Sequence, residues 1–138
     1  MEQLLTREYP PRFVHDVYMP VKSTIQVINH YLFNGSFDFS SAKILVVSTT
    51  TADDAIWLSY QLENMDVQIH FLALRQSLVK NGQERMEGMK TKNISMVKSM
   101  MELPDEYYDF VCCESVLDNV SNPELVVSEV ERVLKPNG

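Results

Sequence analysis

The sequence predicts an α/β protein in which helices cover a parallel β-sheet, and two observations support this. Short apolar runs rich in β-branched residues alternate along the chain with segments whose apolar residues recur at helical spacing. Helical segments separate the first, second and third of these runs, which favours right-handed crossovers and parallel strands. Apolar residues make up 45% of the 138 residues, which is enough for the core of one domain.

The first predicted element is an amphipathic helix within residues 21–33, VKSTIQVINHYLF. Its apolar positions are Val21, Ile25, Ile28 and Leu32. Asn34-Gly35 then provides a stop signal. This helix belongs to a predicted N-terminal helical extension, residues 1–40, which precedes a domain covering residues 41–138.

Four strands and three helices are predicted in the domain. The strands are residues 43–47, 67–74, 93–97 and 107–116. A capping box formed by Thr51 and Asp54 predicts a helix that continues to Leu62. The second helix, from Gln76 to about Met89, has Leu78, Val79, Gly82 and Met86 on one face. The third begins with the cap Asn122-Pro123-Glu124, ends before Pro136, and has the apolar positions Leu125, Val126, Val130, Val133 and Leu134.

Charge and composition exclude several classes of function. A net charge of −7 without a basic cluster disfavours nucleic acid and anionic membranes, so a small-molecule or protein partner is expected. The N-terminus does not resemble a signal peptide, and no segment approaches the roughly 20 apolar residues of a membrane span, which predicts a cytoplasmic protein.

Cysteine and histidine spacing does not predict a metal site. The adjacent Cys112 and Cys113 lie in an apolar run and are expected to be reduced, buried strand residues. His15, His30 and His70 share no ligand spacing with one another or with the cysteines.

Residues 103–138 contain a series of motifs with a specific order and spacing. These are Leu103-Pro104, Tyr108-Asp109-Phe110-Val111, Val116-Leu117 to Val120, Asn122-Pro123, and Glu129 followed by Arg132-Val133-Leu134-Lys135-Pro136-Asn137-Gly138. Together they resemble the class I S-adenosylmethionine-dependent methyltransferases of the small-molecule kind (type 11), and the resemblance extends back to residue 43. It implies a Rossmann-like three-layer sandwich with strand order 3-2-1-4. The family's C-terminal strands are missing, so residues 41–138 would form an incomplete domain.

The resemblance also locates the family's cofactor-binding positions, most of which hold other residue types here. The glycine motif falls on Ser48, Thr50 and Ala52, with Thr49 between the first two and Val46 at the preceding acid position. The ribose-binding acid is replaced by Ala73 and the adenine-binding acid by Met100. A threonine forced to positive φ costs about 1–2 kcal/mol, so we expect a reshaped turn. Each lost charge-assisted hydrogen bond costs roughly 1.5–3 kcal/mol, so S-adenosylmethionine binding should be weakened by several decades.

Other candidate residues keep more than one interpretation. Glu114 and Ser115 follow the predicted fourth strand, where ligands bind in open α/β sheets, and Glu114 is a remaining candidate for a cofactor contact. Asp109 keeps the family motif and is expected to be structural rather than catalytic, so no catalytic residue is assigned. Asp118 and Asn119 are either loop-capping residues or substrate contacts.

The three threonines Thr49, Thr50 and Thr51 also admit an anion site at a helix N-terminus. Asp53 and Asp54 in the first helical turn oppose that reading, since they would repel the anion.

Two hypotheses for function follow. The first is a methyltransferase-like domain that has lost cofactor binding and acts as a binding or scaffold module. The second is a divergent but active S-adenosylmethionine-dependent methyltransferase on a small molecule, which works by proximity and orientation without a catalytic base. In either case the fourth strand would be an open apolar edge. It is completed by the remainder of a longer protein, by a partner, or by a second copy in a homo-oligomer.

Overall fold

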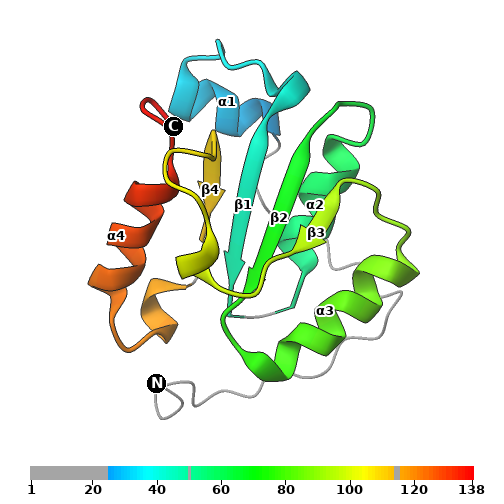
Figure 1. The fold of residues 1–138 in the computed structure, drawn as a ribbon. Coiled ribbons are helices and arrows are strands. Elements are labelled where there is room, and N and C mark those ends of the chain that lie inside the picture. Colours follow the sequence, from blue (N-terminus) through cyan, green and yellow to red (C-terminus); the bar gives the residue numbers. More distant parts are fainter. Residues whose placement is uncertain (1–24, 50, 114–115) are drawn as a thin grey trace.

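The computed structural model of the chain describes residues 25–49, 51–113 and 116–138. Its centre is a parallel sheet of four strands with the order β3-β2-β1-β4 (Figure 1). The strands are β1 (Lys43–Ser48), β2 (Gln68–Ala73), β3 (Ile94–Met96) and β4 (Phe110–Cys112). The predicted α/β class and strand order are therefore confirmed.

Helices cover both faces of this sheet. They are α1 (Ile25–Phe33), α2 (Asp53–Gln61), α3 (Gln76–Gly88) and α4 (Pro123–Val133), with short 3-10 turns η2 (Phe39–Ser41), η3 (Met100–Glu102) and η4 (Leu117–Asn119). Residues of α1, α2 and α3 share one core with the sheet, whereas α4 contributes to a second core on the other face. Among the described residues, no helix combines the length and apolar composition needed to cross a bilayer.

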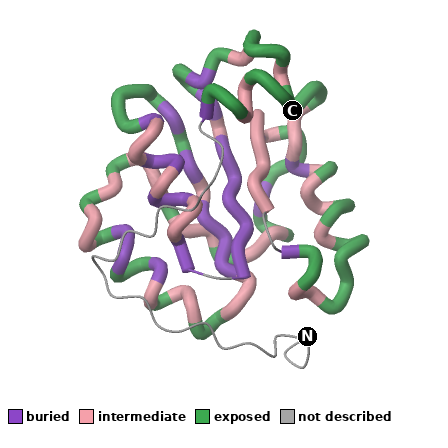
Figure 2. The backbone as a smooth tube through the Cα atoms, turned by 180° about the vertical axis from the view of Figure 1, so that it is seen from behind, coloured by how far each residue is buried: buried purple, intermediate pink, exposed green. Residues whose placement is uncertain are grey.

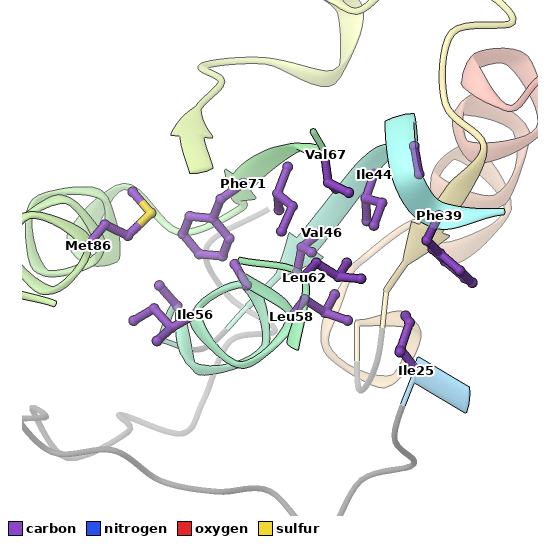
Figure 3. Packing of buried hydrophobic residues seen from close by; sticks show 14 of the residues in the cluster. Ile25, Phe39, Ile44, Val46, Ile56, Leu58, Leu62, Val67, Phe71 and Met86 are labelled. Atoms are coloured by element: carbon purple, nitrogen blue, oxygen red, sulfur yellow. The ribbon is translucent and has the colours of Figure 1, made fainter. Parts of the chain in front are cut away.

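Alternation along the strands divides the buried residues between the two cores. Ile44 and Val46 of β1 face the first core with Phe71 of β2, and Figure 3 shows them packed against Leu58 and other residues of α2. Leu45 and Val47 point to the opposite face and belong to the second core. Figure 2 shows burial concentrated in the two central strands, while α4 remains largely exposed. The four apolar residues of β1 are at most 1% exposed, which explains its continuous apolar sequence.

The predicted fourth strand, residues 107–116, is wrong in length, because β4 contains only Phe110–Cys112. The start of the run pairs elsewhere: the backbone N–H groups of Tyr107 and Tyr108 both donate to the carbonyl of Val133. Cys112 and Cys113 were predicted to be buried, but both are half-buried, and neither forms a disulfide among the described residues. Cys112 is the last residue of β4, the end strand in the sheet order, and Cys113 follows it.

Two helix predictions also need correction. Helix α2 begins at Asp53 after the N-cap Ala52, which makes no side-chain capping bond, so the predicted Thr51 capping box is wrong. Leu32 and Leu125, predicted on buried helix faces, are 61% and 53% exposed. The cap of α4 is confirmed, because the side chain of Asn122 accepts a hydrogen bond from the backbone N–H of Leu125 at 3.1 Å.

Candidate functional site

The candidate site is the edge where β1 and β2 end side by side. Ser48 and Ala73 are register partners, and the backbone N–H of Leu74 donates to the carbonyl of Ser48 at 2.9 Å. Ser48, Thr49 and Ala73 are 1%, 1% and 6% exposed. The structure therefore places the first glycine position of the family motif beside its ribose-acid position. Ala73 presents only a methyl group there, which cannot accept a hydrogen bond.

The turn from β1 into α2 keeps ordinary backbone angles in its described residues. The residues with positive φ in the described part of the chain are Asn34, Gly35, Lys90, Glu106 and Asn137, all outside this turn. Ala52, at the third glycine position, has a φ of −75°. The family's glycines permit positive φ and close approach of a ligand to the backbone. Ala52 has a negative φ, and it is fully buried, so a ligand does not approach the backbone there. Thr50, the second glycine position, lies outside the described residues.

A buried ion pair fastens this turn to α3. Nη2 of Arg85 donates to Oδ1 of Asp53 at 2.7 Å, and the two side chains are 1% and 11% exposed. The hydroxyl of Thr51 donates to the other carboxylate oxygen, Oδ2. A Cβ placed on Gly82, one turn before Arg85, would lie 3.9 Å from the Cβ of Ala52, so α3 packs directly against the turn.

Sequence reasoning missed Arg85. The available signal was its position on α3, three residues after Gly82 and next to Met86, on the face predicted to be apolar. The pair also changes the electrostatics of the alternative anion site considered at Thr49, Thr50 and Thr51. The Arg85 guanidinium balances the charge of Asp53, while Asp54 remains as an acidic residue in the first turn of α2.

At the adenine-acid position, the chain forms the 3-10 turn η3. Ser99 caps it, since its Oγ accepts from the backbone N–H of Met101 at 3.2 Å. Met100 packs against the second core, whereas its neighbour Met101 is 85% exposed. The Met100 side chain thus stabilises the fold at a position where the family uses a carboxylate.

Asp109 ties together three segments of the chain. Its Oδ2 accepts from the backbone N–H of Lys43 at the start of β1, at 2.9 Å. Its Oδ1 accepts from Nζ of Lys135 after α4, at 2.7 Å. Both carboxylate oxygens are therefore engaged in structural contacts at the amino end of β1, away from the Ser48 and Ala73 edge.

Arg132 of α4 makes a second set of contacts that stabilise the fold. Its guanidinium donates to Glu129, to Asp105 and to the carbonyls of Met100 and Leu103. Hydrogen bonds to Glu129 and then to Asp105 raise the pKa of Arg132 above its usual value. The Arg and Lys of the motif at residues 129–138 thus hold the fold together.

The described histidines and cysteines do not form a metal centre. His30 is exposed and lies edge-on to Tyr31, while Nδ1 of His70 lies 2.6 Å from the hydroxyl of Tyr108. Burial and the nearby Lys43 ammonium lower the pKa of His70, and burial raises the pKa of the Cys113 thiol. In residues 25–49, 51–113 and 116–138, no group of three histidine, cysteine or acidic side chains could hold a metal ion.

The remaining predicted residues lie away from this edge or outside the description. Asp118 is exposed and Asn119 half-buried, and both belong to η4. Glu114, Ser115 and His15 lie outside the described residues. The structure therefore brings Ser48, Thr49 and Ala73 together, and places Met100 on the 3-10 turn that follows β3.

Comparison with known proteins agrees with this fold. Residues 45–138 match the family model described as a methyltransferase domain, whereas comparison with curated protein sequences gives no significant match. Similar solved structures include a SAM-dependent methyltransferase from Aquifex aeolicus (22% identity, TM-score 0.62, covering 78% of this chain and 62% of that one). Another is the [4+2]-cyclase SpnF (22% identity, TM-score 0.60, covering 70% of this chain and 36% of that one). A third is PKMT2 from Rickettsia typhi in complex with AdoHcy (20% identity, TM-score 0.59, covering 73% of this chain and 20% of that one).

The chain thus spans about three fifths or less of the length of these solved structures. At these identities the structures are evidence for the fold alone, and the family match, which covers residues 45–138, is evidence for the relationship. The chain belongs to the methyltransferase domain family.

Proposed function

We propose that this chain is a methyltransferase-like module that no longer binds S-adenosylmethionine in the family's manner and acts by binding another molecule. The observation that supports this proposal is the end of β1 and β2. Ser48 and Ala73 lie there in register and buried, where the family has a glycine and a carboxylate. The cofactor's ribose hydroxyls have no charged acceptor at Ala73, and its adenine amino group has none at Met100.

The expected loss of affinity follows from these two positions. Each charge-assisted hydrogen bond contributes roughly 1.5–3 kcal/mol, so losing two costs about 3–6 kcal/mol. This corresponds to roughly two to four decades in dissociation constant. The turn adds to the loss, because Ala52 is buried and Asp53 is held by Arg85. The residues present do not fit the cofactor in the family's arrangement, so we derive no reaction step through it.

Isothermal titration calorimetry with S-adenosylmethionine and S-adenosylhomocysteine tests the proposal directly. We expect no binding heat from the folded protein at micromolar ligand. Binding at or below the micromolar range, together with transfer of a labelled methyl group, would instead support a divergent active methyltransferase. In that case Glu114 and backbone groups would have to replace the missing carboxylates.

A matched pair of variants isolates the effect of the carboxylates. The double variant Ala73→Asp/Met100→Asp restores both acids, whereas Ala73→Asp/Met101→Asp places the second acid on the adjacent exposed side chain. We expect the first variant to gain affinity for S-adenosylhomocysteine relative to the second. Circular dichroism of both variants verifies that they remain folded.

We further propose that the outer edge of β4, the end strand of the described sheet, pairs with a strand supplied by another copy of this chain. Within the described residues β4 pairs only with β1, and an open strand edge favours pairing with another chain. Light scattering across a range of protein concentrations tests this, and a monomer at all of them would contradict it. The partner that we propose is a small molecule or a protein rather than nucleic acid or a membrane, because the net charge is −7.

A further inference from the structure

A polar cavity lies at the amino ends of the strands, whereas Ser48 and Ala73 lie at the carboxyl ends. Its volume is about 260 Å³. Ser59, Tyr60 and Glu63 line it from α2 and the following turn, and Lys90, Lys92 and Asn93 line it from the segment between α3 and β3. The carbonyl of Asn93 accepts from the backbone N–H of Ile69 near the start of β2, at 2.8 Å, which places the cavity at the amino end of the strands. Figure 1 shows the segment between α3 and β3 away from the ends of β1 and β2.

The charge of this cavity is opposite to that of the whole chain. Lys90 and Lys92 oppose the single acid Glu63, so the lining has a formal charge of +1 in a chain of −7. Both lysines are exposed, and their ammonium groups are available to a ligand at the mouth. An anionic ligand is therefore attracted to this cavity more strongly than to the average surface of the molecule.

The interior of the cavity offers fixed hydrogen-bonding groups. Ser59 is 3% exposed, and its hydroxyl donates to Oδ1 of Asn93, which orients that amide. Nδ2 of Asn93 is buried and has no hydrogen-bond partner among the described residues. A buried donor without a partner costs about 1–3 kcal/mol, so a ligand oxygen that reached Nδ2 would offset this cost.

Thr91, which also lines the cavity, is held in position by the end of α3. Its backbone N–H and its hydroxyl both donate to the carbonyl of Met86, at 3.3 Å and 3.1 Å. Its hydroxyl proton is therefore in use, and the lone pairs of Oγ1 remain to accept a hydrogen bond from a ligand. Glu63 offers further acceptors on the other wall. The cavity thus combines donors for an anion with acceptors for hydroxyl groups.

We propose that this cavity binds a phosphate monoester of a small hydroxylated molecule. The phosphate contacts Lys90 and Lys92, and the hydroxyl groups of the ligand donate to Glu63 and Thr91. The volume lies just below the roughly 300–1,000 Å³ typical of pockets for drug-sized ligands, which matches a small metabolite. This site is distinct from the edge at Ser48 and Ala73, so it holds whether or not S-adenosylmethionine binds.

Titrations followed by amide NMR test the proposal with three probes: ribose 5-phosphate, inorganic phosphate and ribose. We expect ribose 5-phosphate to bind more tightly than either of the other two, with the largest shifts at Thr91 and Asn93. Lys92→Gln should weaken this binding about fivefold or more, because it removes a charge-assisted contact. Lys98→Gln, an exposed lysine that is not part of the lining, should change it less than about twofold, as expected for a distant charge screened by salt.

Three results would overturn the proposal. They are no shifts with ribose 5-phosphate at millimolar concentration, equal affinity for inorganic phosphate, and equal weakening by Lys92→Gln and Lys98→Gln. Retained dispersion in the spectra of both variants verifies that they are folded.

Discussion

Replacing Asp109 by alanine should destabilise the protein by about 2–3.5 kcal/mol. The change removes the acceptor for the backbone N–H of Lys43 at 2.9 Å, and a hydrogen bond to a charged group contributes about 1.5–3 kcal/mol. It also removes the ion pair with Lys135, whose side chain is 38% exposed, so that pair contributes only about 0.5 kcal/mol. Urea denaturation measures the loss as a lower midpoint with an unchanged slope.

Two control variants separate the contacts of Asp109. Asp109→Asn keeps an oxygen that can accept from the Lys43 N–H, so we expect a loss of about 1 kcal/mol. Lys135→Met removes the ion pair alone and should cost about 0.5 kcal/mol. An Asp109→Ala variant within about 0.5 kcal/mol of the parent would refute the structural role that we assign to this carboxylate.

Three further predictions concern other contacts. Arg85→Met leaves Asp53 charged in a buried site, so the free energy of unfolding should fall by about 3–5 kcal/mol. The control Lys80→Met removes an exposed ion pair and should cost less than about 0.5 kcal/mol. Equal effects of the two variants in urea denaturation would contradict this prediction. Burial, followed by the nearby Tyr107, raises the pKa of Tyr108 from 10.0 to about 12. The folded state thus holds this proton more tightly than the unfolded state, and stability should fall by about 2–3 kcal/mol as pH rises from about 10 to 12. Tyr108→Phe should lack this fall in alkaline denaturation, and its persistence would assign the effect to another group. Asn122→Ala removes the cap of α4 and should cost about 1 kcal/mol, and Asn122→Gly only a few tenths, by thermal unfolding; an equal cost would argue against the cap.

The helices and strands were predictable where local rules and burial agree. The apolar run of β1 and the Asn122-Pro123 cap are signals that depend on residues adjacent in sequence, and both elements formed as predicted. The length of β4 was not predictable, because Tyr107 and Tyr108 are apolar enough for a strand but bond to Val133, far along the chain. The exposure of Leu32 follows from the position of α1 on the sheet, which periodicity alone does not specify.

For the candidate site, the sequence specified the residue types and the tertiary structure specified their contacts. The family positions at Ala73 and Met100 were identified from motif spacing, since a missing carboxylate is visible in the sequence itself. The ion pair between Arg85 and Asp53 was not, because the two residues lie 32 positions apart and meet only when α3 packs against the turn before α2. The polar cavity lined by Lys90 and Lys92 also forms only when segments that are distant in the sequence pack together. Lys90 and Lys92 lie two positions apart in the sequence, but only folding places Ser59, Tyr60 and Glu63 opposite them and so forms the cavity.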